Sequence, residues 1–203
     1  MAERAAFLIV DVQVDFCPGG NLAVPAGDTI IPVINRYVEL FRKAGLPLFA
    51  SRDWHPPATS HFVQYGGLWP PHCVQGSEGA RFHPTLQLLD DVTVVSKGMD
   101  PAKDDYSAFH AVTEQGTPFP GLLLELGIER LYIGGLATDY CVRASALEGI
   151  KQGFAVTVLT DAVKGVNLKR GDSARALKEM ARAGAEMADM AVIEERLKNW
   201  SFL

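Results

Sequence analysis

Short apolar runs rich in β-branched residues alternate along this chain with stretches in which apolar residues recur at helical spacing. Each run ends in polar residues or glycine, which is typical of buried strands. The expected strands are residues 7–10, 46–50, 92–95, 130–133 and 154–159. The expected helices are residues 30–44, 138–151 and 173–183. Such alternation predicts a parallel sheet covered on both faces by helices.

A short apolar run at residues 190–193 is expected to add one more strand, so we predict an α/β, doubly wound sheet of about six strands. Hydrophobic residues make up 48% of the chain and charged residues 21%, which is enough apolar material for a packed core. Because 203 residues match the usual size of one domain and no linker or repeat interrupts them, we expect a single domain over 1–203.

Charge and cysteine content exclude several classes of protein. The chain carries 24 acidic and 19 basic residues and no dense basic run, which argues against nucleic acid as a partner. Three cysteines are too few, and odd in number, for a disulfide framework, so at least one thiol should be free. No stretch approaches the roughly 20 apolar residues that cross a bilayer, and the N-terminus lacks the pattern of a signal peptide. We therefore expect a soluble cytoplasmic protein with no membrane partner.

Reactive side chains stand at the ends of four predicted strands. Ligands of open α/β sheets bind outside the carboxyl ends of the strands, so these side chains are candidates for one site. Asp11 follows the first strand, Asp53 and His55 follow the second, Lys97 follows the third, and Cys141 comes shortly after the fourth.

Cys141 has the most specific context. Gly134 and Gly135 permit a tight turn, and Thr138 or Asp139 could cap the next helix, which places Cys141 in its first turn. Backbone N–H groups there favour a thiolate and could hold an oxyanion. The alternative is that Cys141 is a small buried hydrophobic residue.

A nucleophilic thiol needs a base, and the only histidines near a strand end belong to the loop after Asp53. Asp11 could accept the thiol proton if burial raises its pKa, and the Lys97 ammonium could hold both groups in place. Taken singly, Asp11 could instead cap a helix and Lys97 could be a solvated surface residue.

A second constellation comprises Asp53, His55, His61 and His72. One carboxylate and three imidazoles suit Zn(II), Fe(II) or Mn(II). The alternative is a loose cluster of solvated histidines. Aromatic residues follow nearby, and either Phe16 or Trp69 could stack on a flat substrate, although each could equally be core packing.

Motifs spread over nearly the whole chain form a recognisable set: Val10-Asp11-Val12-Gln13-Val14-Asp15-Phe16, Ser51-Arg52-Asp53-Trp54-His55-Pro56, His61-Phe62, Trp69-Pro70-Pro71-His72-Cys73-Val74, Ser96-Lys97-Gly98, Tyr106-Ser107-Ala108-Phe109 and Gly135-Leu136-Ala137-Thr138-Asp139-Tyr140-Cys141-Val142. With these motifs the chain resembles the nicotinamidase/pyrazinamidase branch of the cysteine hydrolases related to isochorismatase. The resemblance implies a three-layer α/β/α sandwich with a mostly parallel six-stranded sheet, a Cys-Asp-Lys triad, one divalent metal ion and no organic cofactor.

The resemblance also implies a role for each matching residue. Cys141 would be the nucleophile, Asp11 the base and Lys97 the supporting cation. Asp53, His55 and His72 match metal ligands, while His61 matches a ligand found in only part of the family. Leu136-Ala137 matches a non-proline cis peptide, and the N–H groups of Ala137 and Cys141 would form the oxyanion hole. The substrate pocket would be lined by Phe16, Trp69, Tyr106 and Leu136.

The implied reaction is deamidation of nicotinamide, or of a related small aromatic amide such as pyrazinamide, through a thioester. Residues 99–105, a charged stretch before Tyr106, depart from the family pattern and put the pocket rim in doubt. A metal-independent isochorismatase-like or N-carbamoyl amide hydrolase is the alternative enzyme, but it would leave the Asp53, His55 and His72 set unexplained. A catalytically silent binding protein on the same fold is the non-enzyme alternative. Assembly into a homo-oligomer stays open.

Overall fold

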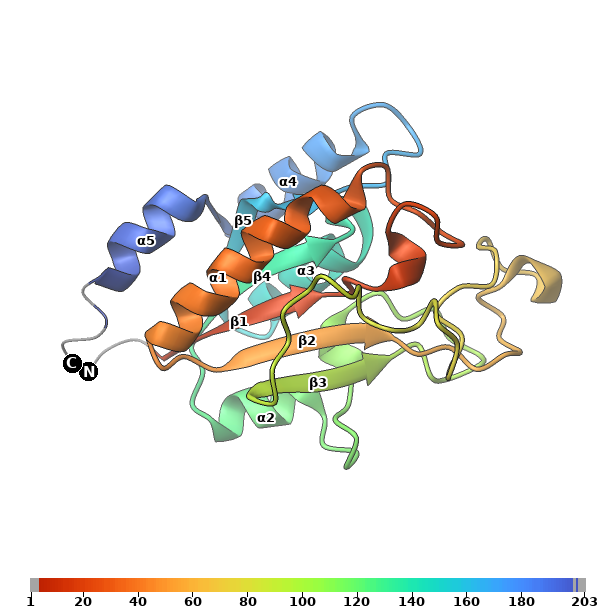
Figure 1. Ribbon diagram of the computed structural model, residues 1–203, viewed down its shortest axis with the longest axis horizontal. Helices are drawn as coiled ribbons and strands as arrows, with labels where there is room; N and C mark the ends of the chain where they lie inside the picture. The colour runs from red at the N-terminus through yellow and green to blue at the C-terminus, as the bar shows by residue number, and fades with distance from the viewer. Residues whose placement is uncertain (1–3, 199, 201–203) are drawn as a thin grey trace.

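The sheet has six strands, and every neighbouring pair is parallel (Figure 1). The computed structural model describes residues 4–198 and 200. The strand order is β3-β2-β1-β4-β5-β6. This confirms the predicted α/β class and the number of strands. The strands are β1 (Ala5–Val10), β2 (Leu48–Asp53), β3 (Val92–Lys97), β4 (Arg130–Leu136), β5 (Ala155–Lys164) and β6 (Glu186–Ala188).

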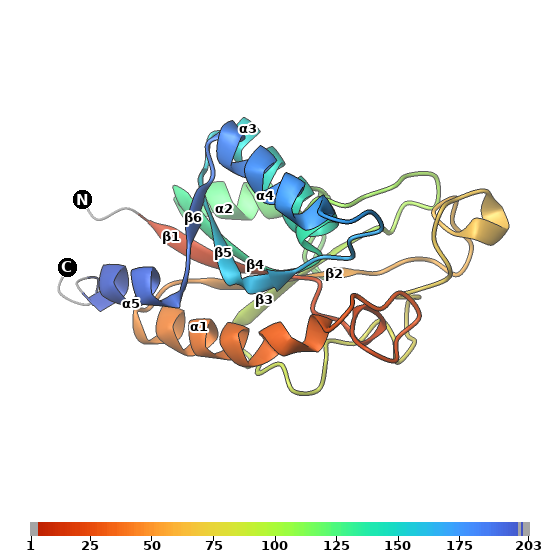
Figure 2. The ribbon, with the colours of Figure 1, turned by 90° about the horizontal axis from the view of Figure 1, so that it is seen from above.

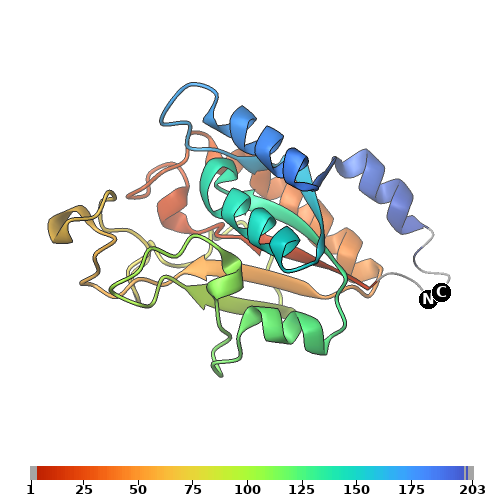
Figure 3. The same cartoon turned by 180° about the vertical axis from the view of Figure 1, so that it is seen from behind.

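Helices cover both faces of the sheet. The helices are α1 (Ile31–Lys43), α2 (Phe119–Glu125), α3 (Arg143–Lys151), α4 (Asp172–Ala183) and α5 (Met190–Lys198). Figure 2 shows α1 and α5 on one side, and Figure 3 shows α2, α3 and α4 on the other. The expected three-layer α/β/α arrangement is therefore present.

The central strand β1 is buried on both faces, and its side chains alternate between two hydrophobic cores. The Phe7 ring contacts Tyr37 and Phe41 of α1, at centroid distances of 5.9 and 5.2 Å. Leu8 packs into the opposite core, which also contains Phe119 of α2. Because β1 packs against helices on both faces, the residues that follow its carboxyl end have a fixed position.

The prediction of a strand at residues 190–193 is wrong. These residues form the first turn of α5, and the sixth strand is β6, just before it. Met190, Ile193 and Leu197 are the buried residues of α5, and they recur at helical spacing. The short run was mistaken for a strand because four apolar residues do not distinguish the two periods. Helix α2 was not predicted, since it has only seven residues.

The connections between β2 and β3 and between β3 and α2 are long loops with short helical turns at Val63–Tyr65 and Ala108–His110, and much of their length projects beyond the carboxyl ends of the strands (Figure 1). Within the described residues, no helix is long and apolar enough to cross a membrane. Residues 1–3, on which the signal-peptide prediction partly rests, lie outside the described part of the chain, as do the last residues of the expected 1–203 domain.

Candidate active site

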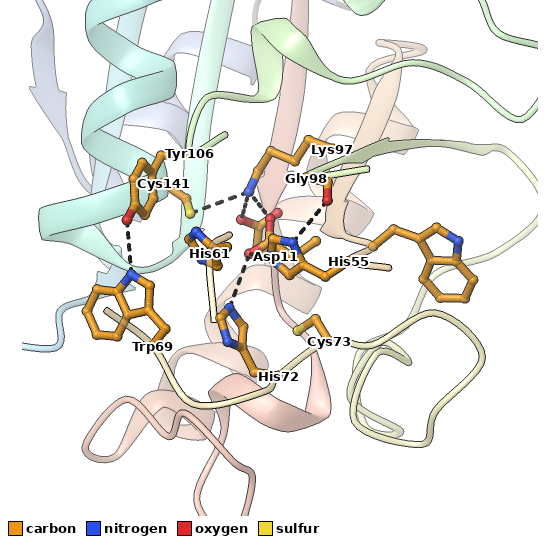
Figure 4. Close-up of polar contacts among 12 residues, drawn as sticks. Asp11, His55, His61, Trp69, His72, Cys73, Lys97, Gly98, Tyr106 and Cys141 are labelled. Carbon is orange, nitrogen blue, oxygen red and sulfur yellow. Dashed lines mark hydrogen bonds and ion pairs between the residues drawn. The ribbon is translucent and has the colours of Figure 1, made fainter. Parts of the chain in front are cut away.

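The reactive side chains gather where the strand order reverses, between β1 and β4. An open parallel sheet has a crevice at this point, outside the carboxyl ends of the strands. Asp11 directly follows β1, Asp53 and Lys97 are the last residues of β2 and β3, and Cys141 lies in the turn after β4. The structure thus brings together the groups that the sequence placed at separate strand ends (Figure 4).

Lys97 lies at the centre of the first cluster. Its Nζ is 2.8 Å from Asp11 Oδ2 and 3.5 Å from Cys141 Sγ, and it also contacts Asp53 Oδ1. The Lys97 side chain is 0% exposed, so its charge is balanced by the two carboxylates rather than by water. The alternative of a solvated surface lysine does not apply.

Burial governs the protonation of the cluster. Burial disfavours the Lys97 ammonium, but Asp11 and Asp53 outweigh it and raise the pKa of Lys97 well above its usual value. Burial raises the pKa of Asp11, although Lys97 opposes this shift. Burial also raises the pKa of the Cys141 thiol, with further contributions from Asp11 and Asp53 that Lys97 only partly offsets. The prediction that the Cys141 pKa is lowered is therefore wrong, because its surroundings shift it upwards.

The turn that carries Cys141 differs from the predicted helix start. Residues Thr138–Val142 form a π-helical turn, in which Val142 N donates to Ala137 O. Asp139 does not cap it; instead its carboxylate accepts the N–H groups of Val166 and Asn167, at 2.9 and 2.7 Å. Thr138 makes no side-chain cap either. The peptide bond Leu136-Ala137 is cis, as the family resemblance implied.

Gly135 shows why the strand before this turn needs a glycine. Its φ is +124°, and a Cβ there would lie 2.1 Å from the carbonyl oxygen of Val10. No other residue could let β4 approach β1 so closely. The close approach brings the Cys141 turn to the end of β1, where Asp11 lies.

The second cluster consists of three buried histidines whose nitrogen atoms lie within 4.8 Å of one another: His55, His61 and His72. The Nδ1 atoms of His55 and His72 donate to the carbonyl oxygens of Gly98 and Pro70, at 3.0 and 2.8 Å. Their Nε2 atoms are 3.6 and 4.0 Å from Asp53 Oδ2.

These residues fit a divalent metal ion. Because Nδ1 carries the hydrogen in His55 and His72, the Nε2 lone pair of each ring is free to bind a metal ion. Among the described residues, the buried Nε2 atom of His55 has no hydrogen-bond partner. Burial lowers the pKa of His72 to about 4, against the opposing charge of Asp53, so this ring is neutral at pH 7. The donor set of imidazoles and a carboxylate suits Zn(II), Fe(II) or Mn(II).

An aromatic pocket opens between the two clusters. Phe16, Trp69, Tyr106, Leu136 and Ala137 all line it, together with Cys141, Asp53, His61 and His72. Trp69 Nε1 donates to the Tyr106 hydroxyl at 2.9 Å, which joins two loops across the rim (Figure 4). Sequence reasoning missed four further lining residues: Leu22, Val24, Tyr140 and Val166. Of these, only Tyr140 lies in a quoted motif, and its ring contacts those of Trp69 and Tyr106, at centroid distances of 5.1 and 5.8 Å.

A family model described as the isochorismatase domain matches residues 5–192. The chain belongs to this family. It is 43% identical to the nicotinamidase of Escherichia coli (strain K12) over 206 residues, covering 94% of this chain and 97% of that protein. It is 39% identical to the nicotinamidase/pyrazinamidase of Mycobacterium tuberculosis over 186 residues, covering 90% and 97%. A crystal structure of the Pyrococcus horikoshii pyrazinamidase in complex with zinc superposes with a TM-score of 0.85 at 44% identity, covering 92% of this chain and 99% of that one.

Two buried side chains that the sequence analysis did not select hold the site of this isochorismatase-family chain together. Gln13 Nε2 donates to the carbonyl oxygens of Asp53 and Ala80, at 2.8 and 2.9 Å, while its Oε1 accepts the Asp53 N–H at 2.8 Å. Ser51 Oγ donates to Asp11 Oδ1 at 2.7 Å. Both residues lie inside motifs that the sequence displays, but only the fold shows that they position Asp53 and Asp11.

Proposed function

We propose that this chain is a nicotinamidase, an amidohydrolase that converts nicotinamide to nicotinate and ammonia and also accepts pyrazinamide. Three relatives that align over nine-tenths of the chain, at 38% to 43% identity, are named nicotinamidase or nicotinamidase/pyrazinamidase. The observation that carries the proposal is the position of Lys97 Nζ, which contacts both the Asp11 carboxylate and the Cys141 sulfur beside a cluster of metal-ligating groups.

Asp11 acts as the general base because the neutral Cys141 thiol must lose its proton when it attacks. As the C–S bond forms, the proton passes to Asp11, and the carbonyl oxygen becomes an oxyanion. The N–H groups of Ala137 and Cys141 stabilise that oxyanion. Asp11 then gives its proton to the leaving nitrogen, so the C–N bond breaks and ammonia departs from a thioester.

The second half of the reaction reverses the roles of the same groups. Asp11 takes a proton from a water molecule, whose oxygen attacks the thioester carbon. The C–O bond forms, the C–S bond breaks, and the proton returns to the sulfur of Cys141. Lys97 stays protonated throughout and balances the charge that moves between Asp11 and Cys141.

Asp53, His55 and His72, joined by His61, would hold one divalent ion, which we take to be Zn, Fe or Mn. When bound, such an ion supplies a Lewis-acidic site beside the pocket. The rings of Phe16 and Trp69 hold a flat heteroaromatic substrate between them, and Tyr106 and Leu136 close its rim. The reaction needs no organic cofactor. A free nucleophilic thiol also fits a reducing cytoplasm, where we place the protein.

Ammonia release from nicotinamide and pyrazinamide tests the proposal. Wild-type protein should release ammonia from both, and Cys141→Ala should abolish turnover because no other group can form the thioester. Cys17→Ala is the matched control, since Cys17 is also a buried free thiol. Substantial turnover by Cys141→Ala would refute the nucleophile.

Two further results separate the alternatives. If a chelator that removes bound metal leaves substrate affinity and turnover unchanged, the chain is a metal-independent hydrolase of the same fold. If wild-type protein binds nicotinamide in calorimetry but releases no ammonia from it, the chain is a binding protein. The nicotinamidase proposal requires that both metal removal and Cys141→Ala lower turnover.

A further inference from the structure

Residues 99–105, the charged segment between β3 and Tyr106, are anchored on the loop that carries His61. The carbonyl oxygen of Pro101 accepts the Ser60 N–H at 2.8 Å and the Thr59 hydroxyl at 3.3 Å. Thr59 Oγ1 in turn accepts the N–H of His61 at 3.3 Å. The segment that departs from the family pattern is thus attached to the two residues that precede His61.

Asp104 extends from this segment to the His61 ring. Its Oδ1 lies 2.5 Å from His61 Nδ1. An ionised carboxylate can only accept, so the ring donates from Nδ1 and its Nε2 keeps a lone pair. The His61 side chain is 3% exposed, whereas that of Asp104 is 54% exposed. One partner therefore belongs to the buried cluster and the other to the surface segment.

The orientation of His61 matches that of the other two histidines. All three rings have Nδ1 occupied, but His55 and His72 are held by backbone carbonyls and His61 by a side chain. The His61 ring stacks on His55, with centroids 4.7 Å apart and planes 19° apart. Histidines that ligate a metal commonly donate their other ring N–H to a carboxylate or a backbone carbonyl, and all three rings of the cluster have this arrangement.

We propose that Asp104 is a positioning residue that makes His61 a direct third imidazole ligand of the divalent ion. The inference rests on the metal centre of the proposed function. Residues 99–105 then have a chemical role, because they connect an exposed segment to the metal cluster through one hydrogen bond. The next residue, Tyr106, accepts the Trp69 N–H, so the same stretch of chain also fixes the pocket rim.

The test is the Zn(II) affinity of the metal-stripped full chain, measured by competition with a chromogenic chelator and without substrate. Loss of a carboxylate that holds a ligating histidine lowers metal affinity by about 10- to 100-fold. We expect a loss of this size for Asp104→Ala and a smaller one for Asp104→Asn, whose amide oxygen can still accept from Nδ1. Asp104→Asn also keeps the test valid if the alanine variant folds poorly.

The matched control is Asp105→Ala. Asp105 lies in the same segment and also binds a histidine Nδ1, that of His110 at 2.8 Å, but His110 is 54% exposed and outside the cluster. We expect Zn(II) affinity to change less than about twofold, well below the effect of a positioning carboxylate. An equal loss for Asp104→Ala and Asp105→Ala would overturn the proposal, because it would reflect damage to the segment.

A double-mutant cycle tests whether Asp104 acts through His61. In a His61→Ala background, Asp104→Ala should cause no further loss of Zn(II) affinity. The visible absorption of the Co(II)-substituted protein should change alike in Asp104→Ala and His61→Ala and stay unchanged in Asp105→Ala. Additive losses, or a wild-type Co(II) spectrum in His61→Ala, would overturn the proposal.

These measurements are independent of turnover. A chain whose Zn(II) affinity depends on Asp104 but that releases no ammonia from nicotinamide would refute the proposed function and leave this inference intact. A chain that deamidates nicotinamide but whose Zn(II) affinity does not depend on Asp104 would refute this inference and leave the proposed function intact.

Discussion

Replacing Lys97 with methionine removes the only cation in contact with Asp11 and Asp53 among the described residues of the first cluster. Methionine fills a similar volume without charge. Because Lys97 is fully buried, neither solvent nor a surface residue can replace its ammonium. The variant therefore leaves two carboxylates with no cation between them.

The distances set the magnitude. At the 2.8 Å between Lys97 Nζ and Asp11 Oδ2, an effective dielectric constant of about 20 gives an attraction of about 6 kcal/mol. The carboxylates of Asp11 and Asp53 have oxygen atoms within 4.8 Å, at which distance their repulsion is about 3 kcal/mol. Part of this cost is avoided when one carboxyl group takes up a proton. Removing one partner of a buried ion pair typically lowers the free energy of unfolding by about 3–5 kcal/mol, and we expect a loss of this size for Lys97→Met at pH 7.

The pH dependence distinguishes this charge effect from a packing defect. Without Lys97, one carboxyl group in the folded variant holds a proton well above its unfolded pKa. A carboxyl group with a raised folded pKa contributes stability at low pH that is lost as the pH rises. The difference in free energy of unfolding between wild type and Lys97→Met should therefore increase from pH 5 to pH 8, by up to about 1.4 kcal/mol per pH unit.

Urea unfolding of the metal-free proteins at several pH values provides the assay, with the free energy of unfolding as the readout. The double variant Lys97→Met with Asp11→Asn is the control, since it removes one of the two carboxylates and should narrow the gap. A loss below about 1 kcal/mol, or a gap that does not change with pH, would refute the argument that Lys97 balances two buried charges.

Two other predictions concern the support of the site. Gln13→Ala leaves buried backbone groups of Asp53 and Ala80 without hydrogen-bond partners, so the free energy of unfolding in urea should fall by about 3 kcal/mol. The control is Gln75→Ala, which removes one exposed hydrogen bond to Trp54 O and should lower the free energy of unfolding by less than about 1 kcal/mol. The lowered pKa of His72, about 4, means that the unfolded chain binds its proton first as the pH falls. The free energy of unfolding of the metal-free protein should therefore fall by about 3 kcal/mol between pH 7 and pH 4, and that of a His72→Gln variant should fall correspondingly less. Stability curves of the two proteins that run parallel over this pH range would contradict the lowered pKa of His72.

The sequence was sufficient to predict the sheet and the position of the site, for one physical reason. Buried parallel strands are short apolar runs, and each ends where the chain leaves the core, so a polar residue such as Asp11 or Lys97 marks the end of its strand. The carboxyl ends of parallel strands share one edge of the sheet, which brings these residues together without any knowledge of the loops. The sixth strand was misplaced because three residues of β6 carry too little pattern.

The contacts made by the loops could not be predicted. Asp104 is one of several acidic residues in a charged segment, and nothing in its spacing identifies His61 as its partner. Gln13 is a polar residue in an apolar motif, and its three hydrogen bonds depend on how the loop after β1 meets Asp53. Pairings between loops depend on the tertiary fold and leave no periodic trace in the sequence.

The direction of the pKa shift of Cys141 was predicted wrongly because the helix-end argument considered only the local backbone. In the folded chain, Sγ lies beside Asp11 and Asp53 as well as Lys97, and a thiolate would add a further negative charge to a buried group in which two carboxylates already face one ammonium. The proposed mechanism therefore has the Cys141 proton pass to Asp11 as the thiol attacks.

Asp53 joins the two clusters that the sequence presents as separate. Its Oδ1 contacts Lys97 of the first cluster, and its Oδ2 faces His55 and His72. Despite burial, which opposes ionisation, Lys97 and the two histidines lower the pKa of Asp53, so the same carboxylate serves both sides as an anion. A change in charge at the histidine cluster must then alter the balance around Lys97, Asp11 and Cys141. The histidine cluster and the Lys97 cluster form one electrostatic unit, in which a substitution on either side will affect the other.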